Sequence, residues 1–327
     1  MELSEKIKNT VCGSYENPDT WIYTHSDNGI YVHEVCFDSG KGGEEVKIMH
    51  ATDLHFNYIN EKDFDNEEVM LTIRHRFWNA NGAAVISTKK IMEYGKNFDQ
   101  TVITGDVLDY LSFGAMELMD KYVWDKDPNV LVSVGGHEFL YQMQTGVKDK
   151  TPLENRYKIV ADFWRHDIYY TSKILKDKVM VIQLDNSQHK YWEHQVEKLE
   201  NDINTARKNG YVVLIFQHDP LCTGNPEDTN VQAVREYDGE FYNFYEKSVG
   251  HDLSDEATAK MYALLTENAD VIKGFFCGHL HSTYFTRVKG SYSDENGTVH
   301  EVYIPQYVLE GAVYDDYAGH IIEITVK

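Results

Sequence analysis

The chain has 327 residues, of which 42% are hydrophobic and 6 are proline, so it can bury a large core and shows no linker composition. We therefore expect one folded domain over residues 1–327 and exclude a disordered chain. The 53 acidic residues outnumber the 31 basic ones, and the net charge of −22 disfavours a long nucleic acid or an anionic membrane as partner. No segment has the length and apolarity of a membrane span or a leader, so a cytoplasmic location is expected.

The N-terminal part of the chain predicts a β-hairpin. Residues 21–35 alternate around Asn28-Gly29, a dipeptide typical of two-residue hairpin turns. We expect a hairpin extension within residues 1–45 that is part of the same domain. Strand-like runs in 291–327, which contain another Asn-Gly pair, are expected to form antiparallel strands at the edges of the sheets.

Five short apolar segments between these ends predict strands that terminate in polar residues. Near-continuous apolar runs are typical of strands covered on both faces. Each of these runs ends in Asp, His, Gly or Glu. The segments are 46–55, 101–109, 129–138, 212–220 and 271–281.

Helical segments separate several of these strands, at 83–97, 115–124, 191–208 and 254–268. In the last of them, Ser254-Asp255-Glu256 predicts an N-terminal cap and an acidic first turn. The alternation of strands and helices indicates an α/β architecture, in which ligands collect at the carboxyl ends of the strands. We therefore expect the polar strand ends to meet at one site.

The residue types at these strand ends predict a metal site. Imidazole and carboxylate together suit zinc, iron or manganese better than calcium. Six such groups exceed one tetrahedral shell, which favours two ions that share a carboxylate. Each motif alone is more often a turn or a chance spacing, and the weight lies in their succession along the chain. The residues are Asp53, His55, Asp106, His218, His279 and His281.

The order of these motifs resembles the calcineurin-like metallophosphoesterases, whose pattern is D-x-H, G-D, G-N-H-[DE], H and G-H-x-H. In this chain the pattern reads Asp53-Leu54-His55, Gly105-Asp106, Gly135-Gly136-His137-Glu138, His218 and Gly278-His279-Leu280-His281. The resemblance implies an α/β fold in which two central mixed β-sheets form a sandwich flanked by helices, in four layers.

The resemblance also implies roles for individual residues. The first ion would be held by Asp53, His55, Asp106 and His281, and the second by Asp106, His218, His279 and the asparagine of G-N-H. A hydroxide that bridges the two ions would attack phosphorus. His137 would protonate the leaving oxygen. The carboxylate of Asp109 would orient His137, unless Asp109 serves instead as a helix cap.

This chain departs from the family pattern at one position, because Gly136 stands where the pattern has its metal-binding asparagine. Water or a nearby side chain such as Asn57 or Gln217 could fill the place, the second ion could bind weakly, or catalysis could be lost. We favour a working phosphoesterase with an altered second site. The alternative is a catalytically impaired metal-binding scaffold of the same fold.

The expected substrate is a small phosphorylated molecule, either a phosphomonoester or a phosphodiester. The Asp-Arg-Gly that follows Gly-Asp in phosphoprotein phosphatases is absent, since Tyr110 and Leu111 follow Asp109. Two insertions could line a substrate pocket, residues 56–80 with Arg74-His75-Arg76 and the aromatic segment 236–245. For Arg74-His75-Arg76 we favour a solvated helix face, and for 236–245 packing onto the core explains the aromatic residues at least as well. Manganese, iron and zinc all fit as the two ions.

Overall fold

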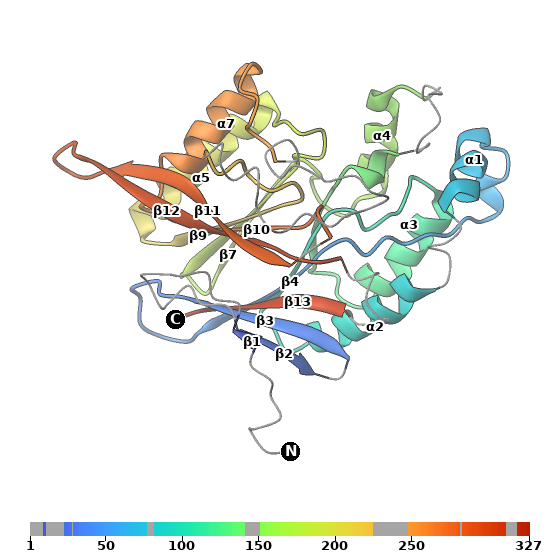
Figure 1. The fold of residues 1–327 in the computed structure, drawn as a ribbon, viewed down its shortest axis with the longest axis horizontal. Helices are drawn as coiled ribbons and strands as arrows, with labels where there is room; N and C mark the ends of the chain where they lie inside the picture. The colour runs from blue at the N-terminus through green and yellow to red at the C-terminus, as the bar shows by residue number, and fades with distance from the viewer. Residues whose placement is uncertain are drawn as a thin grey trace.

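The computed structural model describes residues 9–10, 23–27, 29–76, 82–140, 151–224, 248–281, 283–311 and 319–327. Within these ranges the chain forms two β-sheets with helices on their outer faces (Figure 1). No helix in the part of the chain described here combines the length and the apolarity needed to cross a bilayer.

The first sheet has seven strands in the order β1-β2-β3-β13-β4-β5-β6. Strands β4, β5 and β6 run parallel to one another. Strand β13 pairs in parallel with β3 and antiparallel with β4, so the sheet is mixed. The strands are β1 (Asn9–Thr10), β2 (Tyr23–Asp27), β3 (Ile30–Phe37), β4 (Val46–Ala51), β5 (Gln100–Thr104), β6 (Leu131–Ser133) and β13 (Gly319–Val326).

The second sheet has six strands in the order β11-β12-β10-β9-β8-β7. Strands β8, β9, β10 and β12 run parallel, and antiparallel strands β7 and β11 form its two edges. The strands are β7 (Tyr170–Leu175), β8 (Val179–Leu184), β9 (Val212–Gln217), β10 (Ile272–Cys277), β11 (Tyr284–Ser293) and β12 (Val299–Val308).

The two sheets pack face to face, with helices outside them. Apolar side chains from both sheets, such as Ile48, Val102, Val181 and Phe216, form one buried cluster between them. The outer face of the seven-stranded sheet packs against α1 (Glu67–Arg76), α2 (Ala83–Gly95), α3 (Phe113–Met119) and α4 (Leu153–Phe163). The outer face of the six-stranded sheet packs against α5 (Glu193–Asn209) and α7 (Glu256–Thr266), seen above it in Figure 1. These four layers confirm the predicted α/β sandwich.

The N-terminal hairpin is present, but the C-terminal strand is not at an edge of its sheet as the sequence led us to expect. Strands β2 and β3 pair antiparallel, although Asn28 of the turn lies outside the described residues. Strand β13 inserts between β3 and β4, where Ile324 pairs with Val35 on one side and Ile48 on the other. Apolar residues lie on both of its faces, and a strand of that kind gains most when both faces are covered.

The predicted helices are present with small changes at their ends. Segments 83–97, 191–208 and 254–268 correspond to α2, α5 and α7, and Asp255 caps α7 by accepting a hydrogen bond from Thr258 N at 2.8 Å. Segment 115–124 is α3 followed by a π-helical turn at Asp120–Trp124. Helices α1 and α4 were not predicted, because charged residues interrupt their apolar periodicity. The β7–β8 hairpin was also missed, although β8 begins with an uninterrupted apolar run that could have indicated a strand.

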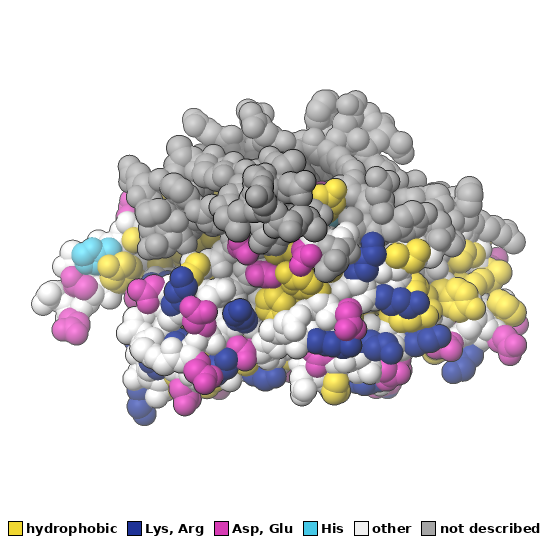
Figure 2. Space-filling view, turned by 90° about the horizontal axis from the view of Figure 1, so that it is seen from below, with side chains coloured by type: hydrophobic (Ala, Val, Ile, Leu, Met, Phe, Trp, Pro, Cys, Tyr) yellow, Lys and Arg dark blue, Asp and Glu magenta, His cyan; other side chains and the backbone are white. Residues whose placement is uncertain are grey.

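The surface charges are mixed on the face drawn in Figure 2. Over its described part, Lys and Arg side chains lie among Asp and Glu side chains rather than in a field of one sign. A face of this kind gives little long-range attraction to a polyanion.

Candidate metal centre

The candidate ligands lie where parallel strands of both sheets end. Asp53 and His55 follow β4, and Asp106 follows β5 in the seven-stranded sheet. His218 follows β9, and the segment with His279 and His281 follows β10 in the six-stranded sheet. Because parallel strands end at a common sheet edge, the sandwich brings all six side chains together. They form two overlapping groups of three or more ligand atoms, each group with all its atoms within 4.8 Å of one another.

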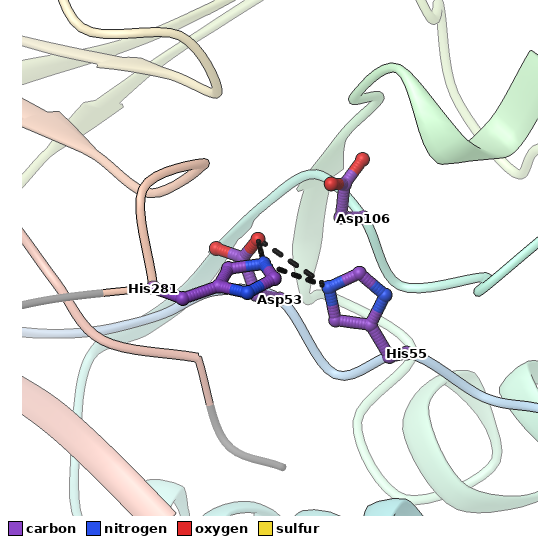
Figure 3. A group of neighbouring side chains, drawn as sticks. All are labelled: Asp53, His55, Asp106 and His281. Atoms are coloured by element: carbon purple, nitrogen blue, oxygen red, sulfur yellow. Dashed lines mark hydrogen bonds and ion pairs between the residues drawn. The ribbon is translucent and has the colours of Figure 1, made fainter. Parts of the chain in front are cut away.

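The first group contains Asp53, His55, Asp106 and His281. His281 Nε2 lies 3.0 Å from Asp53 Oδ1 and 3.1 Å from His55 Nε2, as the dashed lines in Figure 3 mark. His55 Nε2 lies 3.6 Å from the same Asp53 oxygen. Two imidazole nitrogens and a carboxylate oxygen so close together are the donor set that a zinc, iron or manganese ion prefers.

The second group contains Asp106, His218 and His279. His218 Nε2 lies 3.1 Å from Asp106 Oδ2, while its Nδ1 donates to the Thr104 carbonyl at 2.8 Å. The Nε2 atom is buried, and among the described residues it has no well-aligned hydrogen bond, its close contact with Asp106 included. A buried nitrogen is rarely left without a partner, and a cation at this point would supply one. The residues present therefore fit two ions that share Asp106.

Local backbone geometry also marks these residues. Five of the six candidate ligands have left-handed φ angles: Asp53 at 51°, His55 at 49°, Asp106 at 48°, His279 at 73° and His281 at 47°. Side-chain-bearing residues rarely adopt this conformation, and it costs free energy. Strain of this kind collects at functional sites, where the surrounding structure enforces it.

Histidine neighbours keep the two buried aspartates ionised. Burial alone would raise the pKa of Asp53, but His218 and His281 hold it well below its usual range. Burial opposes ionisation of Asp106 in the same way, and His218 and His137 outweigh it and lower the pKa. Both carboxylates are therefore in the form that coordinates a cation.

The pKa values of the candidate histidine ligands shift in different directions. Burial lowers the pKa of His279 to about 4, and it lowers the pKa of His281 more than Asp53 raises it. Burial also lowers the pKa of His55, but hydrogen bonds to Asp109 and Asp53 outweigh this effect and raise the pKa to about 9. His279 and His281 are thus neutral at pH 7, as a metal ligand must be.

The glycines of the motifs are of two kinds. A Cβ atom at Gly278 would lie 2.0 Å from Thr52 Oγ1, and one at Gly135 would lie 2.3 Å from Asp106 Oδ1. These positions require glycine because the ligands approach the backbone closely. At Gly136, in contrast, the described residues place only the Ser187 carbonyl oxygen near a Cβ atom, at 3.6 Å. With φ at −67°, position 136 can accept a side chain, so the missing asparagine leaves open space.

His137 lies beside the two groups, with 17% of its side chain exposed. Its backbone N donates to Asp106 Oδ1 at 2.9 Å, and its Nε2 lies 3.8 Å from Asp106 Oδ2. Its Nδ1 donates to the backbone carbonyl of Asp109 at 2.8 Å. The imidazole is therefore held by its Nδ1 side, with Nε2 on the side of the shared aspartate.

Asp109 lies at the site, but its carboxylate is not where we expected it. Oδ1 lies 3.1 Å from His55 Nδ1 and 3.7 Å from His137 Nδ1, so the side chain orients His55 and the backbone carbonyl orients His137. Asp109 does not cap α3, since Ser112 does so through Ala115 N. Asp106 and Asp109 lie in the turn that follows β5, and the backbone carbonyl of Asp109 in this turn contacts His137 Nδ1.

The two side chains considered as substitutes for the asparagine are engaged elsewhere. Asn57 donates to Asp109 Oδ2 at 2.6 Å. Gln217 accepts from Tyr191 OH at 2.7 Å and donates to the Asp219 carbonyl at 2.9 Å.

Three further residues belong to the site, to which the sequence analysis gave no role. Glu138, the last residue of its motif, accepts four backbone N–H groups, from Asp106, Val107, Leu108 and Gly135. Two more groups of ligand atoms adjoin the first two: His55, Asp109 and His137 form one, and Asp219 and His189 form the other with His279. Asp219 directly follows a candidate ligand, which was a usable signal, whereas His189 stands in no motif.

Several sequence expectations fall outside the described part of the chain. Segment 236–245 and residues 77–80 are not described, and Arg74-His75-Arg76 end α1 with undescribed side chains. Their contribution to a substrate pocket stays a prediction.

Comparison with known proteins was made by family, sequence and structure. A scan against family models finds no match, and a search of curated proteins also finds none. Among solved structures, a dimetal phosphatase from Danio rerio matches with 14% identity and a TM-score of 0.44, over 83% of this chain and 89% of that one. Purple acid phosphatase PPD1 from yellow lupin (Lupinus luteus) seeds matches with 12% identity and a TM-score of 0.44, over 86% of this chain and 49% of that one. This chain thus spans about half the length of the lupin protein.

The geometry of the chain itself carries the assignment. The motif residues follow one another in the expected order and come from the carboxyl ends of β4, β5, β6, β9 and β10. They meet in two ligand groups that share Asp106. Two mixed sheets packed between helices are the arrangement that the resemblance to the calcineurin-like metallophosphoesterases implied.

Proposed function

We propose that this protein is a dinuclear metal-dependent phosphoesterase that hydrolyses a small phosphomonoester or phosphodiester. The observation that carries the proposal is the sharing of Asp106 by two groups of buried ligand atoms. One carboxylate between two such groups would hold two ions a few ångströms apart. When bound, such a pair activates water and stabilises the charge that develops on the oxygens around phosphorus.

The ion pair would be held by this chain's own residues in two sets. Asp53, His55 and His281 would bind the first ion, and His218 and His279 the second, with Asp106 common to both. Asp109 holds His55 through its ring Nδ1, and the Thr104 carbonyl holds His218 in the same way. These contacts direct the Nε2 atoms toward the aspartates and reduce the reorganisation that binding requires. Manganese, iron and zinc all suit this donor set.

His137 would act as the general acid. Its Nδ1–H is engaged by the Asp109 carbonyl, so the proton that can be transferred is on Nε2. Nε2 is on the side of Asp106 and is partly exposed, where the leaving oxygen of a substrate bound at the ligand groups could receive the proton. Positioned acids of this kind contribute about 10²–10⁴-fold to the rate.

The test is turnover of an aryl phosphate and an aryl phosphodiester with added Mn²⁺. We expect hydrolysis of at least one ester and a loss of about 10²–10⁴-fold in kcat for His137→Ala. Metal content, measured by elemental analysis, should stay at the wild-type level, because His137 is not in the first or the second ligand group. The ratio of the two esters decides between monoesterase and diesterase.

The alternative function is a metal-binding scaffold without catalysis. The observation in its favour is the open space at Gly136, which removes one expected ligand of the second ion. Wild-type protein that binds two ions but hydrolyses neither ester would support the scaffold and refute the phosphoesterase. Equal turnover by wild type and His137→Ala would refute the general-acid role alone.

A further inference from the structure

An imidazole and a carboxylate adjoin the second ligand group without belonging to it. Asp219 directly follows His218 at the end of β9, and His189 lies in the segment between β8 and α5. Asp219 is buried, whereas 47% of the His189 side chain is exposed. The ligand atoms of His189, Asp219 and His279 all lie within 4.8 Å of one another. His279 therefore belongs both to this group and to the second ligand group.

The ring of His279 lies beside the rings of both His189 and His218. The His189 and His279 centroids are 5.7 Å apart, and those of His218 and His279 are 5.2 Å apart. The spacing of His55 and His281 in the first group is 4.9 Å. His189 does not share a group with Asp106 and His218, so its ring would have to turn toward them to bind the second ion.

The contact between His189 and Asp219 prepares the ring for coordination. His189 Nδ1 lies 2.8 Å from Asp219 Oδ2. In the same way Asp109 holds Nδ1 of His55, and the Thr104 carbonyl holds Nδ1 of His218, while Nε2 of each faces an aspartate of the ligand groups. Histidines that bind metals characteristically have the second ring nitrogen held by a carboxylate or carbonyl. His189 shows this arrangement although no motif includes it.

The vacancy at position 136 adjoins the same segment. A Cβ at Gly136 would lie 3.6 Å from the carbonyl oxygen of Ser187, two residues before His189, and near no other atom of the described residues. Within the described part of the chain the second group has three protein ligands, and the buried Nε2 of His218 has no well-aligned hydrogen bond. The segment that borders the missing side chain thus carries an additional imidazole.

We propose that His189, held by Asp219, supplies the ligand of the second ion that Gly136 cannot supply. The inference rests on the proposed function in that it requires a second bound ion. It assigns to this chain a ligand set of Asp106, His218, His279 and His189 around that ion.

The test is a titration of metal-free protein with Zn²⁺ in competition with a chromophoric chelator. Wild type should bind two ions per chain. His189→Ala should bind the first ion as wild type does and the second about 10–100-fold more weakly, the loss typical when a metal's coordinating surroundings are impaired. Adding Gly136→Asn to His189→Ala should recover most of the lost affinity, because asparagine has room at position 136.

The matched control is His300→Ala. His300 is also a largely exposed histidine, 42% by side chain, and its Nε2 lies 3.1 Å from Asp294 in the β11–β12 hairpin, away from the ligand groups. Its removal should change neither Zn²⁺ affinity. Since His189 is exposed, the His189→Ala protein is expected to fold, and far-ultraviolet circular dichroism checks this.

The outcomes separate the two proposals. The role of His189 would be overturned if His189→Ala bound both Zn²⁺ ions as tightly as wild type does. It would also be overturned if His189→Ala lost affinity for the second ion and Gly136→Asn did not recover it. Failure of wild type to bind Zn²⁺ in its first group would instead overturn the proposed metal-dependent function.

Discussion

Replacing Glu138 by glutamine should destabilise the protein and weaken the metal centre. The buried carboxylate accepts four backbone N–H groups: Val107 at 2.6 Å and Leu108 at 3.0 Å on Oε1, and Gly135 at 2.7 Å and Asp106 at 3.1 Å on Oε2. These bonds join the turn after β5 to the turn after β6. Asp106 and His137 lie on these two turns, so one carboxylate sets their relative position.

The expected loss follows from the number of donors left without an acceptor. Glutamine has nearly the same shape, but its NH₂ group replaces one oxygen, so two of the four buried N–H groups would face another donor. Each unsatisfied buried donor costs about 1–3 kcal/mol. We therefore expect the free energy of unfolding to fall by about 2–6 kcal/mol, a large part of the roughly 5–15 kcal/mol typical of a folded domain.

Urea unfolding of metal-free protein measures this loss, and Zn²⁺ titration measures its effect on the centre. Glu197→Gln, on the exposed face of α5, makes the same chemical change without buried contacts and should stay within about 0.5 kcal/mol of wild type. A change below about 0.5 kcal/mol for Glu138→Gln would show that the four N–H groups do not depend on this carboxylate, and the reasoning would fail.

Three further predictions concern the glycine pair, the metals and pH. Gly135→Ala should cost about 1–3 kcal/mol in urea unfolding, since its Cβ would lie 2.3 Å from Asp106 Oδ1, whereas Gly136→Ala should stay within about 0.5 kcal/mol; equal costs would contradict the geometry. Removing the ions with a chelator should lower the urea midpoint. Ions that bind only the folded state add about 2.7 kcal/mol to the free energy of unfolding when their free concentration is 100 times Kd. Identical midpoints with and without Zn²⁺ would argue against a structured metal site. Burial lowers the pKa of His166, whose Nε2 accepts a hydrogen bond from Val132 N at 3.0 Å, so the free energy of unfolding should fall as pH drops below about 6.5 toward the folded-state pKa. Glutamine can accept the same bond without titrating, so the urea midpoint of His166→Gln should depend less on pH between 7 and 5. An unchanged pH dependence would assign the effect to other groups.

Much of the candidate site could be predicted from local sequence. Asp53, His55 and Asp106 each follow an apolar run of strand length. Such a run indicates a strand without knowledge of the strands that pair with it. Since parallel strands end at one edge of a sheet, residues at their carboxyl ends meet even when they are far apart in sequence. The chemistry of carboxylate and imidazole then indicates a metal.

Other features could not be predicted, because they depend on which distant segments become neighbours. Nothing local to β13 shows that it pairs with both β3 and β4 rather than closing an edge. The backbone carbonyl of Asp109, and not its carboxylate, reaches Nδ1 of His137 because of the path of the turn after β5.

The residue types of the centre and their places at strand ends were thus determined by the sequence alone, since both depend on short-range apolar patterning. Tertiary structure decided that Asp106 is shared by two ligand groups and that His189 and Asp219 stand beside the space at Gly136. Those relations depend on how two separately formed sheets pack and on the course of the segments between their strands. Packing of that kind is a property of the whole chain, because each contact is made by residues that are distant in sequence.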